Sequence, residues 1–418
     1  MGRRPRWSPT EGPRSVTPVA SIAMSSGAGW TLTASALFVL GLAIVLLTGL
    51  SILFTLVLPR RPIGPERLSL VINRVVRLMV LAVSRCFRTY ESKDAVLAAS
   101  GPFAIVAQLV VWLGLFVVGY SLMLEPHTHR LSNAFAQGAV SVFSVGTGSA
   151  GGSRDVSVDI AAGATWAVVV AMQIAYLPAL YSAFSEREGL VALLESRAGV
   201  PAWGPEVLAR HQMVGISDTL PDFYADWEKW AADLAESHTT YPVLLLFRSP
   251  DPWYSWLIGL LAVLDGAAMH LALAPEGASS QARLCIRMGF TALQRIAVTL
   301  GWWIDPDPDP EGPIQLTFEE FESAVTMLAD YGFPMERSAK AAWPDFRGWR
   351  INYESIAYRL ADRVTAPPAP WSGPRRHLRT GTVAPRRPPH RRPAELSLIE
   401  RRPEVVVTPP PRRSRPSR

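Results

Sequence analysis

The chain has 418 residues, of which 49% are hydrophobic and 18% are charged, and its formal net charge is +6. Residues 30–58, 95–124 and 160–185 contain no Asp, Glu, Lys or Arg over 29, 30 and 26 residues. About 20 apolar residues are enough to cross a bilayer, so these segments exclude a wholly soluble protein and predict three transmembrane helices. The last 53 residues carry thirteen Arg and three Glu, so the positive charge lies in this tail.

Residues 1–29 are polar and contain four Arg, and we expect a disordered leader. The apolar run at 30–58 is far longer than the ~7–15-residue core of a cleaved signal peptide, which predicts a membrane anchor. Met24 is an alternative start of translation, and it would remove the basic leader.

The distribution of basic residues predicts the topology. Residues 59–94 carry eight Lys or Arg, whereas residues 125–159 carry two. The positive-inside rule places the first of these loops in the cytoplasm, the N-terminus outside, and everything after about residue 186 in the cytoplasm. Because Arg, Ala and Pro are frequent, the composition is typical of a high-GC bacterium, so the inner (cell) membrane is expected.

Within the basic loop, residues 68–83 have helical periodicity, with apolar residues on one face and Asn73, Arg74 and Arg77 on the other. This pattern predicts an amphipathic helix in the membrane interface. A helix packed against the cytoplasmic domain is an equally good interpretation. The apolar positions are Leu70, Val71, Val75, Leu78 and Met79.

Residues 186–365 predict a cytoplasmic α-helical domain. Segment 253–273 is apolar, but Asp265 and His270 lie in it, which favours a buried helix over a fourth span. Residues 366–418 contain thirteen Pro and predict a disordered tail, either a solvated linker or a segment that touches anionic lipid. The expected helices of the domain are 222–238, 253–273, 279–302, 317–329 and 346–364.

Between the second and third spans, residues 131–149 are uncharged and too short to cross the membrane twice as helix, so they predict a re-entrant segment. The segment contains Ser144, Val145, Gly146, Thr147 and Gly148. Alternating glycines let consecutive carbonyl groups turn towards one axis. Four copies would form rings of carbonyl oxygens that replace the hydration shell of a cation.

The order span, re-entrant helix, Ser-Val-Gly-Thr-Gly and span over residues 95–185 resembles the pore module of the two-transmembrane potassium channel family, whose filter reads Thr-Val-Gly-Tyr-Gly. The resemblance implies a homotetramer in the lipid membrane with K⁺ as the permeant ion and no prosthetic group. It implies that Ser144 is the innermost ligand, that Val145, Gly146 and Thr147 supply carbonyl rings, and that Gly148 completes the outer mouth.

The sequence also departs from that family. Thr147 replaces the filter aromatic, Ser149 replaces the usual acidic residue, and Val140 stands where the pore helix often carries a carboxylate. A less firmly held filter discriminates less between potassium and sodium, so we expect cation conduction that leans towards potassium. A plain Gly/Ser-rich extracellular loop is the alternative.

In the third span, Gln173 and Pro178 are candidate pore or gate residues. A polar side chain deep in a span should face the bundle interior or water, and proline removes a helix hydrogen bond. A bend in a packed helix explains Pro178 equally well.

Other functions have little support in the sequence. Cys86 and Cys285 cannot form a disulfide framework or a four-ligand zinc site, and neither Glu236 with His238 nor Asp265 with His270 has the spacing of metal ligands. Phosphate-loop, dinucleotide and serine-elbow motifs are absent, so an enzyme is not expected. The tail lacks a nucleic-acid recognition motif.

Residues 227–256, with Trp227-Glu-Lys-Trp230 at their start, resemble an uncharacterised family of bacterial ion-channel-like membrane proteins, and that resemblance names no ligand. A nonconducting membrane sensor or scaffold is the alternative function, and a membrane-tethered enzyme is a weaker third.

Overall fold

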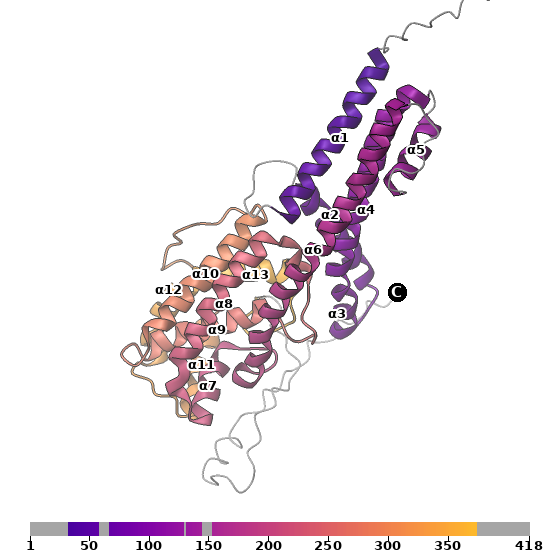
Figure 1. The fold of residues 1–418 in the computed structure, drawn as a ribbon. Helices are drawn as coiled ribbons and strands as arrows, with labels where there is room; N and C mark the ends of the chain where they lie inside the picture. Colours follow the sequence, from indigo (N-terminus) through magenta and orange to yellow (C-terminus); the bar gives the residue numbers. More distant parts are fainter. Residues whose placement is uncertain (1–31, 58–66, 129–130, 144–152, 374–418) are drawn as a thin grey trace, which may run out of the picture.

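The computed structural model describes residues 32–57, 67–128, 131–143 and 153–373. Within these ranges the chain is all-helical and contains no strand. A bundle of apolar helices forms one end of the molecule, and a helical domain built from residues 199–373, the C-terminal domain, forms the other (Figure 1).

Two long apolar helices, α1 (Leu32–Leu56) and α4 (Ser100–Thr128), pack side by side in the bundle (Figure 1). Gly41 of α1 faces Gly119 of α4 so closely that a Cβ atom on Gly41 would overlap the Gly119 carbonyl oxygen. Small residues at such crossings let helix backbones approach, which is how apolar helices associate in lipid.

Helix α2 (Arg67–Ser84) lies where the bundle meets the C-terminal domain (Figure 1). Its buried residues Ile72 and Val76 share an apolar cluster with η2 (Pro242–Leu246) of that domain. Another face is exposed, so α2 has one side packed on protein, as the second interpretation expects, and one apolar side that no described residue covers, while its location in a membrane interface stays a prediction. The exposed apolar residues are Val71, Val75, Leu78, Met79 and Val83.

Helix α3 (Tyr90–Ala98) precedes α4 almost without a break, and α5 (Leu131–Phe143) runs back along the far end of α4 (Figure 1). With 13 residues, α5 is too short to cross a bilayer, because a span needs about 20 residues.

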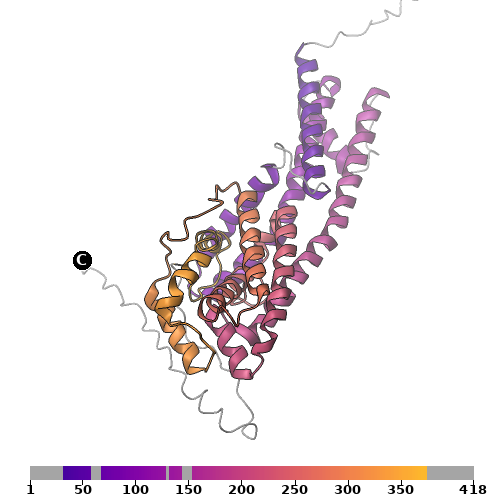
Figure 2. The same cartoon turned by 90° about the vertical axis from the view of Figure 1, so that its left-hand side faces the viewer.

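Helix α6 (Ser153–Ala198) has 46 residues, which at 1.5 Å per residue is about 69 Å. It runs unbroken from the bundle into the C-terminal domain (Figure 2). The sequence predicted its apolar part, residues 160–185, but not its continuation, because the charged residues after 185 were assigned to a separate domain.

The C-terminal domain is built around α9 (Trp256–Leu273), every residue of which is buried. This helix is also long and apolar enough to cross a membrane, but protein covers it on all sides. The hydroxyl of Ser255 caps its N-terminus. The surrounding helices are α7 (Gly204–Val214), η1 (Ser217–Thr219), α8 (Leu220–Thr240), α10 (Ser280–Thr299), α11 (Phe318–Asp330), α12 (Ala339–Arg350) and α13 (Glu354–Val364).

Two boundaries of this domain differ from the sequence prediction. Segment 346–364 is two helices, because the chain turns at 351–353 between α12 and α13. The predicted tail begins too early, since Ala366, Ala369 and Trp371 are buried in the domain core. Apolar residues scattered among prolines gave no helical periodicity, so their packing was not visible in the sequence.

Candidate functional site

The predicted filter, Ser144 to Gly148, lies in segment 144–152, outside the described residues. The structure describes the elements that enter and leave it, α5 and α6. The predicted gate residues Gln173 and Pro178 are both on α6.

Helix α5 is seated tightly on α4. A Cβ atom on Gly138 would overlap the hydroxyl of Ser121 and would lie 3.0 Å from the Ser121 backbone nitrogen. Ala134 and Val142, one turn to either side of Gly138, are completely buried. The contact therefore depends on glycine at residue 138, and it fixes the position of α5 along α4.

A buried carboxylate joins α5 to α6. Asp159, near the start of α6, is 1% exposed and accepts a hydrogen bond from the Ser141 hydroxyl. The Gln137 amide nitrogen lies 3.3 Å from the second carboxylate oxygen and donates to it. A charge buried in an apolar bundle is costly unless it is hydrogen-bonded, and these bonds supply the compensation.

The sequence missed this group. The family resemblance directed attention to Val140 on α5, where this chain lacks the usual carboxylate and which is 48% exposed, whereas the buried acid stands on α6. The available signal was a single Asp at the border of the uncharged segment 160–185.

A second contact ties α4 to α6. The hydroxyl of Tyr120 is 2.7 Å from the Thr165 hydroxyl, and it donates to the Ala161 carbonyl at 3.3 Å. Together with the Asp159 network, this contact joins α4, α5 and α6 into one unit on either side of the filter segment.

Gln173 is 5% exposed, so its side chain lies inside the chain rather than on its surface. Neither its Nε2 nor its Oε1 atom has a hydrogen-bond partner among the described residues. Pro178 is exposed, and α6 continues through it as helix. The structure thus places these two residues on different faces of one helix, and it does not bring them together.

Where α6 enters the C-terminal domain, Arg187 is buried at 3% exposure. Its guanidinium donates to the carbonyl oxygens of Leu244 at 3.1 Å and Phe247 at 3.0 Å, and its Nε donates to Glu188 at 2.7 Å. Its Nη1 lies 3.1 Å from Nε2 of His238 on α8. The sequence gave no sign that this Arg differs from the others.

The protonation of His238 follows from its neighbours. Arginine only donates, so Nε2 of His238 accepts, while Nδ1 donates to the Leu234 carbonyl at 3.1 Å. The imidazole is therefore neutral. Burial, and then the charge of Arg187, hold the pKa of His238 well below its usual range.

A cavity of about 320 Å³ opens beside this junction, between α6 and α8. Its polar lining includes Glu186, Asp233 and Glu236, and Trp230 and Tyr241 contribute aromatic surface. The indole of Trp230 donates to the Arg187 carbonyl at 3.0 Å. The cavity therefore borders the contacts that hold α6 to the domain.

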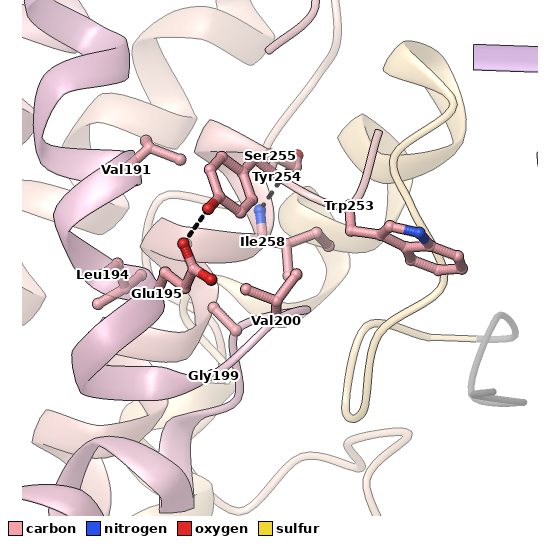
Figure 3. A pocket seen from close by; sticks show the side chains of 11 residues that line it. Val191, Leu194, Glu195, Gly199, Val200, Trp253, Tyr254, Ser255 and Ile258 are labelled. Atoms are coloured by element: carbon pink, nitrogen blue, oxygen red, sulfur yellow. Dashed lines mark hydrogen bonds between the residues drawn. The ribbon is translucent and has the colours of Figure 1, made fainter. Parts of the chain in front are cut away.

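Further along α6, the hydroxyl of Tyr254 donates to the Glu195 carboxylate across a small pocket (Figure 3). Val191, Leu194 and Ile258 line the same pocket, whose volume is about 10 Å³. That is about the space of one water, so this is a packing contact between α6 and the segment before α9.

A third junction joins the start of the second span to the domain. Arg248 forms an ion pair with Asp94 of α3, and it donates to the carbonyls of Val364 at 2.8 Å and Thr365 at 3.2 Å. Its Nη2 donates to the Tyr90 hydroxyl at 2.6 Å. Helices α3 and α6 are therefore each fixed to the C-terminal domain through an arginine, the half-buried Arg248 and the buried Arg187.

A fully buried ion-pair network lies in the core of the C-terminal domain. Arg350 pairs with Asp265 of α9 and Glu354 of α13, and it also donates to the Trp371 carbonyl at 2.7 Å. These bonds join three elements in the core. The described residues contain no group of three or more His, Cys, Asp or Glu that could hold a metal ion.

Comparison with protein families, with curated proteins and with solved structures finds no match to this chain. The described part of the chain is all-helical, and four of its helices are long and apolar enough to cross a membrane, which indicates a membrane protein.

Proposed function

We propose that this protein is a homotetrameric channel that conducts monovalent cations passively, with a preference for potassium. The observation that carries the proposal is the position of α5, a 13-residue helix between two helices long enough to span a membrane. A chain that enters the bilayer as such a short helix must return to the same side, and only a protein-lined or hydrated path accommodates its backbone there.

The electrostatics of α5 suit a cation. The described part of α5 ends at Phe143 and Ser144 follows in the sequence, so the negative end of the helix dipole would lie next to the first residue of the proposed filter. Ser144 to Gly148 contain no charged side chain, so carbonyl oxygens would be the ligands. Asp159 supports this arrangement because it holds α5 against α6.

An exposed face of α6 supports assembly. Val168 and Ile174 are 56% and 63% exposed, and Ala164, Ala171 and Pro178 are also exposed. In a tetramer this uncharged face would meet the other copies or the pore. A single filter strand cannot surround an ion, so the proposal requires such assembly.

The C-terminal domain would lie in the bacterial cytoplasm, because the basic residues Arg74, Arg77, Arg85 and Arg88 precede the second span on that side of the bundle. The contacts of Arg187 would pass movements of this domain to α6. Pro178 lies between these contacts and the filter, where a bend would open or close a pore.

Flux of K⁺ and Na⁺ through purified protein in liposomes tests the proposal. We expect K⁺ flux to exceed Na⁺ flux, and Gly146→Val to abolish both, because valine resists the positive φ angles available to glycine. Gly49→Val is the matched control, since no atom of the described chain would lie within 4 Å of a Cβ at Gly49. Flux that survives Gly146→Val would overturn the filter assignment.

The oligomeric state gives an independent test. Cross-linking or mass measurement in detergent should give a tetramer, and a stable monomer or dimer would contradict the channel. A nonconducting sensor or scaffold is the alternative, favoured by Thr147 in place of the filter aromatic. A folded tetramer that gives no flux under any condition would support it.

A further inference from the structure

Three arginines meet in a cavity between α2 and the C-terminal domain. Arg74 and Arg77 come from α2, and Arg363 comes from the last turn of α13. The cavity has a volume of about 60 Å³, several times the ~10–15 Å³ that one water requires. The other lining residues are Leu70, Asn73, Pro242, Leu245, Leu246, Leu300 and Val364.

The described lining of this cavity contains no carboxylate. Arg77 donates from Nη1 to the Arg363 carbonyl at 3.0 Å, but its buried Nε has no hydrogen-bond partner among the described residues. Arg74 is exposed at the edge of the cavity. The cavity thus combines three positive charges with one N–H donor, Arg77 Nε, that has no hydrogen-bond partner among the described residues.

The three charges repel one another. Burial, and then the charges of Arg77 and Arg74, lower the pKa of Arg363 to about 10. Burial and the charge of Arg74 likewise lower the pKa of Arg77. A bound anion would neutralise this repulsion, and guanidinium groups match the oxygens of a phosphate geometrically.

The position of α2 indicates where the anion comes from. Val71, Val75 and Leu78 expose an apolar face on the same helix as Arg74 and Arg77. A helix with exposed apolar residues beside arginines, next to membrane-spanning helices, suits the interface plane, where phospholipid headgroups lie. Headgroup phosphates are therefore the anions nearest to this cavity.

We propose that Arg74, Arg77 and Arg363 bind the phosphate of an anionic phospholipid headgroup, which joins α2 to the end of α13. The site is separate from the ion path, and it depends only on the placement of the bundle in a membrane.

Thermal unfolding of the full chain in zwitterionic detergent tests the site, with short-chain phosphatidylglycerol, short-chain phosphatidylcholine and inorganic phosphate as probes. We expect phosphatidylglycerol to raise the unfolding temperature saturably and phosphatidylcholine to have no such effect. The Arg74→Gln and Arg363→Gln variants should each weaken the phosphatidylglycerol response by about tenfold in concentration, since each loses one charge-assisted contact.

Arg85→Gln is the matched control, because Arg85 is exposed just beyond α2 and does not line the cavity. Arg74 is exposed, and its side chain has no hydrogen bond to the described residues, so Arg74→Gln should fold, and without lipid it should be at least as stable as the wild type because a repelling charge is removed. Equal responses to the two lipids, or equal losses in Arg74→Gln and Arg85→Gln, would overturn the proposal. A phosphate response equal to that of phosphatidylglycerol would overturn the lipid as the source.

Discussion

Asp159 at the start of α6 accepts a hydrogen bond from Ser141 in α5, although 18 residues and the proposed filter separate them. The pair closes the loop that contains the filter segment, because it joins the helix before that segment to the helix after it. One buried carboxylate therefore links the two helices on either side of the proposed filter.

Replacing Asp159 should loosen this loop. In Asp159→Ala the amide of Gln137 loses its acceptor, and the hydroxyl of Ser141 keeps only the Gln137 carbonyl at 2.8 Å, which costs about 1–3 kcal/mol. We expect a lower ratio of K⁺ to Na⁺ flux and a lower unfolding temperature. Asp159→Asn retains an acceptor and should retain most of the ratio. An unchanged flux ratio in Asp159→Ala would contradict the role in positioning.

A second prediction concerns the contact of α5 with α4. Gly138→Ala places a methyl group against Ser121, so α5 must move away from α4, and overpacking of this kind costs about 1–3 kcal/mol. Gly114→Ala in α4 is the control, since no described atom lies within 4 Å of that site. We expect flux to fall in Gly138→Ala alone. Equal flux in the two variants would show that the contact between α5 and α4 does not require glycine at residue 138.

The third prediction concerns Arg187. In Arg187→Met the Phe247 carbonyl loses its donor and Glu188 loses its ion-pair partner, while the Leu244 carbonyl keeps only the Phe247 backbone N–H, and the cost should be about 3–5 kcal/mol. Arg283→Met, at an exposed position of α10, should cost well under 1 kcal/mol. Chemical unfolding of both variants measures the difference, and similar midpoints would show that the junction is not held by Arg187.

Acid should weaken the C-terminal domain. Burial lowers the pKa of both His238 and His211 in the folded protein, whereas the pKa of an unfolded histidine is about 6.5. The unfolded chain therefore binds more protons below that pH, so stability falls as pH drops through about 6.5. The loss approaches about 1.4 kcal/mol per pH unit for each histidine.

Unfolding temperatures at pH 7.5 and 5.5 check this prediction. His238→Gln keeps a side chain that can accept from Arg187, and it should show a smaller difference between the two pH values than the wild type. An identical difference in the variant would mean that His238 does not carry the effect.

The apolar spans were predictable because the absence of charge over 25 or more residues is a local property of the sequence. The helix at 131–143 was predictable for the same reason, as an uncharged segment between two spans. The end of α6 was not, since its residues after Ser185 are charged and resemble the start of a new domain. Those residues are rich in Glu, Arg, Leu and Ala, which favour helix, but nothing local shows that this helix is continuous with the apolar one.

The contacts that organise the site were not predictable. Asp159 with Ser141, and Arg187 with His238, are pairs formed by tertiary packing across 18 and 51 residues, and no spacing rule for one helix brings them together. In the sequence Arg187 is one of 41 basic residues. Arg187 differs from most of them because it is buried, and burial is seen only in the fold.

Because α6 runs unbroken from the bundle into the C-terminal domain, a change in its direction at one point moves the ends of the helix relative to each other. About 20 residues, or roughly 30 Å, separate Pro178 from the end of the helix at Ala198. A tilt of about 10° at Pro178 would therefore move that end by roughly 5 Å, a displacement that the Arg187 and Glu195 contacts would impose on the whole C-terminal domain. The reverse also holds, so a ligand that shifts the domain by a few ångströms would turn the apolar half of α6.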